Sequence, residues 1–532
     1  MHQWTGTPRT RVVPTLATVV VAAVALAGCG AGDGAPDPAA TTGAAEAQVP
    51  ASSSDATPVV VTGNVLGREI EMSVGPVVLD GDLAVLRVEA EATSGDDTLF
   101  VGEAFANRTL SQEDTFDGVR LVDLDAGVVR EPARAADGVA LASLEDDRFE
   151  LGPDEEPVVG HVAFAAPASA TTAVLVPYLG LVEDVPVVAA DDAEGLTVPA
   201  AELAPAGLDD VVAPTAVLET FSTSANDAVS TRDTDDLVSV AIDSDVLFAV
   251  DSAELGTASD AALQAVADQL ALAADGELVV VGHTDDQGEE AANQELSERR
   301  AHAVADRLGE IADLGRFDVR VEGRGETEPV ATDGTDEARA LNRRVTVEFV
   351  PAADRSPAEV PAAGELTAPE GATVDGLGGA TLEHADGLGG TQTLHVELVE
   401  VRRAGGYLVG TLDVRNDGTD HAAFVSVLGS VLDGRGELGE GGLGANNVTL
   451  LDGGVRVYPV DYLVDPAFYP DSARSVLADL SVGSLSPGVT SRVTVVWPDR
   501  GGETVVVDVP DGSTEVTDGS TPVRFVDVPV AD

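Results

Sequence analysis

The stretch Val279–Ala301 reads VVVGHTDDQGEEAANQELSERRA and decides the fold of the middle of the chain. It opens as a Val-rich strand, continues as a polar loop with two glycines, and ends in a helix-forming segment. We expect Ser297 to be the N-cap of that helix, which would place Arg300 in the first turn. The pattern therefore predicts that Asp285 follows the end of a strand and that Arg300, fifteen positions later, lies at a helix N-terminus.

Asp285 and Arg300 can together form a binding site for a zwitterion. A carboxylate docked at the helix end would be bound by the guanidinium fork and by free helical N–H groups. The Asp285 carboxylate would accept an ammonium group of the same ligand. The alternative is that Asp285 and Arg300 pair with each other and only tie the loop to the helix.

The surrounding sequence predicts an α/β sandwich over residues 238–352. Helical periodicity and short Val-rich runs alternate there and give a βαβαββ order. The expected elements after the first strand are a helix at 260–274, a strand at 277–281, a helix at 301–314, and strands at 317–321 and 345–349.

Three spaced motifs in this region carry a family resemblance. They are GHTDDQG at 282–288, NQELSERRA at 293–301 and NRR at 342–344. Together with Val246–Phe248 and Asp251–Leu255, they resemble the OmpA-like domain, the peptidoglycan-binding module of outer-membrane and peptidoglycan-associated proteins. The resemblance covers about residues 240–350 and implies a noncovalent wall-binding module.

The resemblance also implies a ligand, the diaminopimelate of the peptidoglycan stem peptide. Its side chain ends in a carbon that bears both an ammonium and a carboxylate. The ligand-binding Asp of the family falls on Asp285 and the ligand-binding Arg falls on Arg300.

Three further residues are candidates for contact with this ligand: Thr284, Asn293 and Arg344. For Thr284 and Asn293 the alternative is structural, a loop cap and a hydrogen bond at the helix turn. We expect Asn342 and Arg343 to hold the final strand to the helices instead.

The amino terminus predicts export and lipid anchoring. Arg9 and Arg11 precede an apolar stretch, 16–27, that is too short to span a bilayer. Residues Leu26–Cys29 resemble the lipobox of bacterial lipoproteins, which implies a signal peptide at 1–28 and a Cys29 that carries lipid, including acyl chains such as palmitate. The alternative is an ordinary cleaved signal with a stray cysteine. Small and polar residues at 29–57 predict a flexible tether.

The two outer segments, 58–195 and 374–532, alternate apolar and polar residues in short runs. This pattern predicts two immunoglobulin-like β-sandwiches flanking the middle domain. The two segments also resemble each other, since 119–128 compares with 448–455. Stretches rich in Pro, Ala and Asp predict linkers at 196–237 and 353–373.

The overall composition excludes several function classes. With 29 Lys+Arg against 93 Asp+Glu among 532 residues, the net charge of −64 argues against nucleic acid as a partner. One cysteine excludes a multi-cysteine metal site, and His283 has no partner histidine nearby in sequence. No zinc-peptidase, redox or phosphate-loop motif is present, so we expect neither a catalytic residue, nor a metal, nor another cofactor.

The sequence as a whole predicts a lipoprotein outside the cytoplasm. Its acyl anchor would hold one end to a cell or outer membrane while the central domain binds the wall, and the sandwiches would act as spacers or bind other envelope proteins. Two alternatives stay open, a wall-targeted hydrolase and an adhesin, each with its activity in the outer sandwiches.

Overall fold

The computed structural model describes residues 56–532 except 95–97, 108–114, 146–147, 154, 194, 205–206, 226–227, 235, 333, 353–370, 386–390, 423–427, 429–434, 436–443, 470–473 and 511–520. The expected signal peptide and Cys29 therefore lie outside the described residues. Among the helices that are described, none combines the length and the apolar character needed to cross a bilayer.

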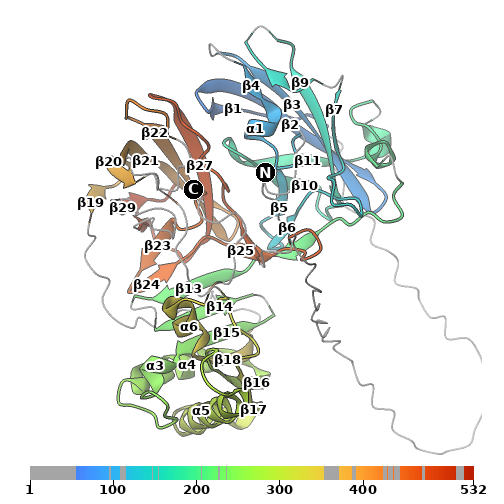
Figure 1. Cartoon of the computed structure of the whole chain (residues 1–532). Coiled ribbons are helices and arrows are strands. Elements are labelled where there is room, and N and C mark those ends of the chain that lie inside the picture. Colours follow the sequence, from blue (N-terminus) through green and yellow to red (C-terminus); the bar gives the residue numbers. More distant parts are fainter. Residues whose placement is uncertain are drawn as a thin grey trace, which may run out of the picture. The chain divides into compact units, whose positions relative to one another are not determined.

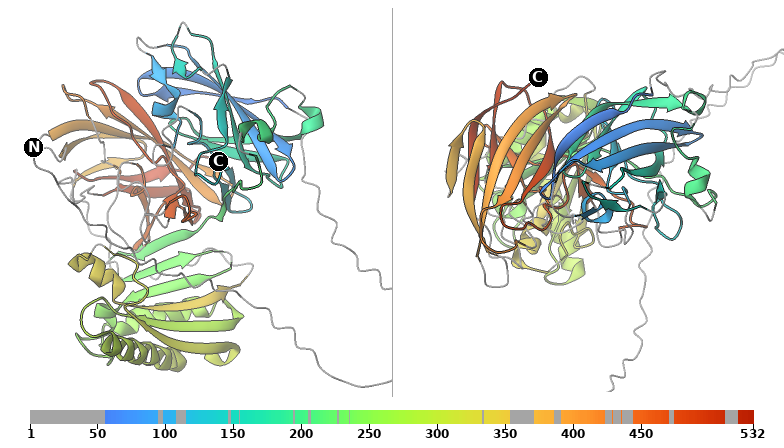
Figure 2. Two further views of the ribbon diagram at one scale, coloured as in Figure 1. Left: turned by 45° about the vertical axis from the view of Figure 1, so that its right-hand side comes forward. Right: turned by 90° about the horizontal axis from the view of Figure 1, so that it is seen from above.

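In the middle of the chain, helices pack on four strands that form one end of an eleven-stranded sheet, which continues into the last sandwich (Figures 1 and 2). The strand order is β17-β16-β18-β15, with β16 parallel to β17 and antiparallel to β18. Its elements are β15 (Val238–Asp243), α3 (Ser244–Leu247), α4 (Ser259–Leu270), β16 (Ala273–His283), α5 (Glu290–Ile311), η3 (Leu314–Arg316), β17 (Phe317–Gly325), α6 (Asp336–Asn342) and β18 (Arg344–Pro351). The core forms because apolar residues spaced three and four apart, such as Ala301, Val304 and Leu308 of α5, face the sheet.

Helix α5 begins earlier than the sequence predicts, and the expectation that Ser297 is its N-cap is wrong. The N-cap is Glu289, and Ser297 lies inside the helix. The Ser297 hydroxyl donates to the carbonyl of Gln294 at 2.8 Å and accepts the amide of Gly325 at 3.0 Å. Because Ala, Glu, Gln and Leu are strong helix formers, the helix extends upstream of Ser297. Arg300 therefore lies well inside α5, and no ligand site at the helix N-terminus involves it.

The first sandwich is built on a ten-stranded sheet. Nine strands follow the order β12-β6-β5-β10-β11-β2-β3-β9-β7, where β12 is Thr215–Val217, and the tenth, β1, pairs with β2. Its core includes Met72, Leu86, Phe116 and Val162, all fully buried. The elements are β1 (Val59–Val65), β2 (Arg68–Asp80), β3 (Leu83–Ala92), β4 (Leu99–Phe100), α1 (Val101–Ala104), β5 (Arg120–Asp123), β6 (Val128–Arg130), β7 (Ala142–Leu144), β8 (Glu150–Leu151), β9 (Val158–Ala165), β10 (Thr171–Val176), β11 (Gly180–Ala189) and η2 (Ala190–Asp192).

The last sandwich packs a four-stranded sheet, β20-β21-β22-β27, against the strands β24-β23-β28-β29-β19. Trp497 of β27 is fully buried between them, and its indole N–H donates to the carbonyl of Val448 at 2.8 Å. The elements are β19 (Ala372–Asp375), β20 (Gly378–Ala385), β21 (Thr391–Ala404), β22 (Tyr407–Asn416), β23 (Thr449–Asp452), β24 (Val455–Val457), β25 (Asp461–Leu463), β26 (Arg474–Val476), β27 (Thr490–Pro498), β28 (Thr504–Val509) and β29 (Val523–Pro529).

The two sandwiches share an order of strand pairing. The hairpin β5–β6 continues through β10 to β11 in the first, and the hairpin β23–β24 continues through β28 to β29 in the last. In the first sandwich the final strand pairs in parallel with an early one, Val187–Ala189 with Val77–Leu79, and in the last sandwich Ala531, just after β29, forms a parallel bridge with Arg402. The resemblance between 119–128 and 448–455 falls on the two equivalent hairpins.

The stretch 196–237, for which the sequence predicts a linker, instead contributes to all three domains. It contains α2 (Ala200–Leu203), β12 (Thr215–Val217), β13 (Thr220–Ser224) and β14 (Val229–Asp233). Strand β12 pairs with β6, β13 pairs with β24, and β14 pairs with β15. The edge strands of the two hairpins have backbone N–H and C=O groups that need hydrogen-bond partners, and this stretch provides them. Because the backbone makes these bonds, they do not require an apolar composition. The second expected linker, 353–373, lies outside the described residues up to 370, and β19 begins within it.

Candidate functional site

A cleft of about 250 Å³ lies where β16, α5 and α3 meet in the middle domain. The residues that line it come from α3 and the segment after it, from the loop after β16, from α5 and from the end of α6. They are Asp245, Val250, Asp251, Thr284, Asp285, Gln287, Asn293, Leu296, Arg300 and Arg343. The structure thus brings four of the five residues proposed for ligand binding into one cleft, and Arg344 is the exception.

Asp285 follows the carboxyl end of β16 and is held by an arginine that the sequence did not single out for the site. Its Oδ2 lies 2.9 Å from Arg343 Nη1, and Arg343 Nη2 lies 2.8 Å from Asp245 Oδ2. Hydrogen bonds to both carboxylates raise the pKa of Arg343 above its ordinary value. Asp285 Oδ1 also accepts the amide of Gln287 at 3.2 Å, so the loop itself orients the carboxylate. The Asp285 side chain keeps 15% of its surface exposed, which leaves it open to a ligand.

Arg300 projects from α5 into the same cleft and forms no ion pair with any carboxylate in the described part of the chain. Its Nε donates to the carbonyl of Ser252 at 3.0 Å, and its guanidinium carbon lies 5.2 Å from the ring centre of Phe248. Burial, and secondarily the charge of Arg343, lowers the pKa of Arg300, while nearby carboxylates oppose the shift. A residue only 4% exposed with no direct counter-ion is suited to binding an anion.

Thr284 and Asn293 occupy different positions in the cleft. Thr284 is buried, and its hydroxyl has no hydrogen-bond partner among the described residues. Asn293 uses its amide N–H groups on Asp285 O at 3.3 Å, Gln287 O at 3.1 Å and Glu326 Oε2 at 2.7 Å. Asn293 therefore fastens the loop, while the hydroxyl of Thr284 is buried without a partner among the described residues.

Arg344, which we expected near the ligand, does not line the cleft, whereas Arg343 does. Its Nη1 donates to Asn342 O at 3.4 Å and its Nη2 to Glu328 O at 3.2 Å. Burial lowers its pKa to about 10. Arg343 caps α6, whereas Arg344 begins β18 opposite Asp243, so the turn between them sends the two side chains apart. The motif alone does not reveal which arginine faces Asp285.

Part of the chain is similar to known proteins. Residues 247–343 match the model of the OmpA family. They form an OmpA family domain. Outer membrane porin F of Pseudomonas aeruginosa is 51% identical over 69 residues, which are 13% of this chain and 20% of that protein. The peptidoglycan-binding protein ArfA of Mycobacterium tuberculosis is 40% identical over 82 residues, 15% of this chain and 25% of that protein. The chain thus spans a quarter or less of the length of these two relatives.

A solved structure is similar to the same region. The cell wall anchor of the type VI secretion system (T6SS) of Pseudomonas aeruginosa is 38% identical and aligns with 24% of this chain and 90% of that chain, with a TM-score of 0.22. The outer-membrane lipoprotein YfiB of Pseudomonas aeruginosa is 46% identical over 71 residues, 13% of this chain and 41% of that protein.

Two glycines of the OmpA family domain fix how closely α5 approaches the sheet. A Cβ at Gly282 would lie 2.2 Å from the carbonyl oxygen of Ser297, and one at Gly323 would lie 2.5 Å from the amide nitrogen of Glu298. Such distances are impossible for any larger residue without movement of the helix. The two glycines therefore set the position of α5, and with it that of Arg300.

His283 of the OmpA family domain is buried beside two arginines. Burial, and then the charges of Arg344 and Arg324, lowers its pKa to about 3, so it is neutral at physiological pH. In the described part of the chain, no group of three or more His, Cys, Asp or Glu side chains could hold a metal ion.

Two functional candidates were missed by the sequence analysis, Asp245 and Arg343. Asp245 lies in the first turn of α3, forty residues before Asp285, and reaches the cleft only through the fold. An acidic residue after a strand is too common a signal to have identified it.

Proposed function

We propose that the OmpA family domain binds peptidoglycan noncovalently through the diaminopimelate of its stem peptide. The observation that carries the proposal is the buried guanidinium of Arg300, which has no carboxylate partner among the described residues and shares a cleft with the Asp285 carboxylate. A ligand that carries a carboxylate and an ammonium on one carbon would complement both groups.

Each end of the zwitterion has its own contacts in this proposal. The ligand carboxylate accepts hydrogen bonds from Arg300 and from the hydroxyl of Thr284, which has no partner among the residues that the structure describes. The ligand ammonium binds Asp285, and the ion pair with Arg343 fixes the orientation of the Asp285 carboxylate. Asp251 also lines the cleft and adds negative charge to it. Each charge-assisted contact contributes about 1.5 to 3 kcal/mol.

The names of the relatives support wall attachment and not catalysis. ArfA is named a peptidoglycan-binding protein, and one similar structure is a cell wall anchor. We therefore infer that the chain lies in the cell envelope and acts as a noncatalytic tether, with the flanking sandwiches as spacers or as docking sites for other envelope proteins.

The membrane end of the tether and the class of the flanking domains are further parts of the proposal. Acylation of Cys29 would anchor the chain to a bilayer, and two or more acyl chains would make that attachment stable. The shared pairing order of the two sandwiches supports an immunoglobulin-like origin for both.

Sedimentation with insoluble wall tests the binding proposal. The full chain lacking residues 1–28 is mixed with walls that contain diaminopimelate and with walls that contain lysine in its place. We expect binding to the first only, and a loss of about 10- to 150-fold in Asp285→Asn and in Arg300→Ala.

Two matched variants control for charge and for helix stability. Asp286→Asn alters the neighbouring carboxylate, and Arg307→Ala alters an arginine on the same helix that pairs with Asp260 and Glu310. Both should bind as the unmodified protein does. Equal binding to the two walls, or full binding by both Asp285→Asn and Arg300→Ala, would contradict the proposal. Release of soluble wall fragments would favour the hydrolase alternative.

A further inference from the structure

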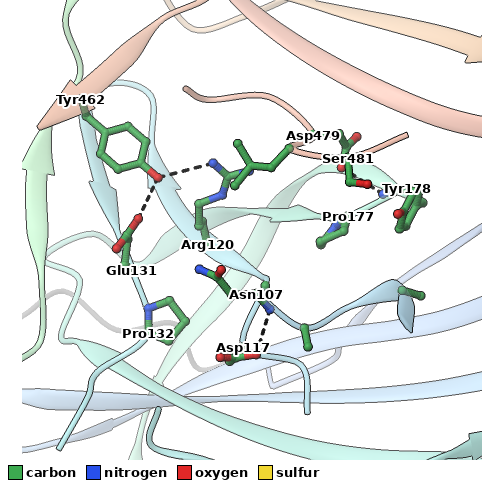
Figure 3. Close-up of a pocket in the computed structure, with 14 residues that line it drawn as sticks. Asn107, Asp117, Arg120, Glu131, Pro132, Pro177, Tyr178, Tyr462, Asp479 and Ser481 are labelled. Atoms are coloured by element: carbon green, nitrogen blue, oxygen red, sulfur yellow. Dashed lines mark hydrogen bonds between the residues drawn. The ribbon is translucent and has the colours of Figure 1, made fainter. Parts of the chain in front are cut away.

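A second cavity, of about 60 Å³, lies between residues of the first and last sandwiches (Figure 3). Asp117, Arg120 and Glu131 line it from the first sandwich, and Tyr462, Asp479 and Ser481 line it from the last. A buried water needs about 10 to 15 Å³ of such space, so the cavity has room for roughly four to six non-hydrogen atoms. It is separate from the proposed wall-binding cleft, with which it shares no lining residue.

The charged groups that line this cavity are unbalanced. Three are carboxylates, Asp117, Glu131 and Asp479, and one is a guanidinium, that of Arg120. Arg120 directs Nη1 to Val476 O at 2.7 Å and Nη2 to Ala478 O at 2.6 Å, so its terminal N–H groups are engaged by the last sandwich. The lining residues therefore carry net negative charge, of which Arg134, whose Nη2 lies 3.7 Å from Asp117 Oδ2, offsets one carboxylate.

Glu131 is the residue that points to a ligand. It is only 6% exposed, and its Oε1 accepts the hydroxyl of Tyr462 at 3.0 Å (Figure 3). Its Oε2 is buried and has no hydrogen-bond partner among the described residues. Burying a carboxylate oxygen without a hydrogen-bond donor costs free energy. A cationic donor would offset more of this cost than a neutral donor would.

Most of the other walls of the cavity are apolar. The apolar ones are Ala104, Ala106, Pro132, Pro177 and Leu480, and Asn107, Gly118 and Tyr178 complete the lining. An acidic group within a narrow apolar enclosure matches a positively charged head on a short hydrocarbon stem.

We propose that this cavity binds a small primary alkylammonium, with Glu131 Oε2 as its counter-ion. The ammonium donates to Glu131, and the stem of about three carbons packs against the alanine and proline walls. The inference does not depend on the proposed wall binding, and variants of this cavity should sediment with walls normally.

Titration calorimetry on the full chain lacking residues 1–28, at pH 7.5 and 150 mM NaCl, tests the proposal with n-propylammonium chloride as probe. We expect one site with millimolar affinity, and at least tenfold weaker binding in Glu131→Gln. Glu145→Gln, which removes an exposed carboxylate of the same sandwich, should bind normally. Ala106→Leu fills the cavity without changing charge and should abolish binding, which keeps the test decisive if Glu131→Gln fails to fold.

Two probes of similar size check the chemistry. 1-Propanol has the same stem without charge, and propionate carries the opposite charge; neither should bind measurably at 50 mM. Binding of either as tightly as propylammonium would overturn the proposal. So would full affinity in Ala106→Leu, or no propylammonium binding up to 50 mM, which would mean that the cavity holds water only.

Discussion

Arg343 Nη1 lies 2.9 Å from Asp285 Oδ2, and the same guanidinium reaches Asp245 through Nη2 at 2.8 Å. The Asp285 carboxylate is thus held by an arginine fifty-eight residues later in the chain and not by Arg300. Because Arg300 is left without a carboxylate partner in the described part of the protein, the two charges proposed to bind the ligand are not neutralised by each other.

Arg343 should act by positioning Asp285. We expect Arg343→Gln to weaken binding of a soluble diaminopimelate-containing tripeptide by about 5- to 30-fold, or about 1 to 2 kcal/mol, because the carboxylate loses its orientation. Calorimetry measures the change. Arg339→Gln, on the same helix and paired only with Asp336 among carboxylates in the described residues, should bind normally. Unchanged affinity in Arg343→Gln would contradict the positioning role.

Gly282 should be required for α5 to pack closely against the sheet. We expect Gly282→Ala to destabilise the domain by about 1 to 3 kcal/mol, because the new Cβ meets the Ser297 carbonyl at 2.2 Å. Faster hydrogen exchange across α5, read by mass spectrometry, would report the loss. Gly406→Ala, where a Cβ meets nothing within 4 Å, is the control. Normal exchange in Gly282→Ala would show that α5 can shift freely.

A buried ion cluster should fasten the middle domain to the last sandwich. Asp461 is fully buried and lies 2.7 Å from Arg232 Nη1 and 2.9 Å from Arg474 Nη2, while Glu219 contacts both arginines. We expect Asp461→Asn to cost about 3 to 5 kcal/mol, since it leaves two guanidiniums with Glu219 as their one carboxylate in the cluster.

Urea unfolding measures this cost. Glu295→Gln removes an exposed partner of Arg299 and should change the free energy of unfolding by less than about 1 kcal/mol. Similar midpoints for the two variants would mean that the buried cluster contributes little.

Asp479 should make stability depend on pH between about 4 and 6. Burial raises its pKa from 3.8 to about 6, against opposing hydrogen bonds from the amides of Thr494 and Tyr178. The folded state therefore binds a proton more tightly than the unfolded state does. The resulting stabilisation is complete below pH 3.8 and is lost as pH rises through 6, by on the order of 3 kcal/mol.

Asp479→Asn should remove this part of the pH dependence, because its side chain does not titrate. Unfolding in urea at intervals from pH 4 to pH 8 tests it, with Asp452→Asn, an exposed residue, as the control. An unchanged slope between pH 4 and pH 6 in Asp479→Asn would assign the dependence to other groups.

The middle domain was largely predictable because its signals are local. The Val-rich run before Gly282 and the helical periodicity after it are properties of neighbouring residues, and the spaced motifs fix their order. Ser297 did not identify the start of α5. A serine can be the N-cap of a helix, but it can also lie within a helix when the residues before it favour helix. In this fold its hydroxyl bonds to Gln294 and Gly325 instead.

The linker prediction at 196–237 differs from the structure for another reason. The composition of a stretch indicates how many apolar side chains it can bury. Strands β12 and β13 form instead because the distant hairpins β5–β6 and β23–β24 have edges with which their backbones pair. Such backbone pairing leaves little trace in the side chains.

By itself, the sequence determined the order of the strands and the two long helices in the middle domain, though not the short helices α3 and α6, and the presence of an acid and an arginine suited to a zwitterion. Only the tertiary structure decided that Arg343 and not Arg344 holds Asp285, that Arg300 stays free of a carboxylate partner among the described residues, and that Glu131 meets Tyr462 across two sandwiches. These relationships join residues tens to hundreds of positions apart. Such contacts depend on how sheets pack and where turns point, which no local pattern encodes.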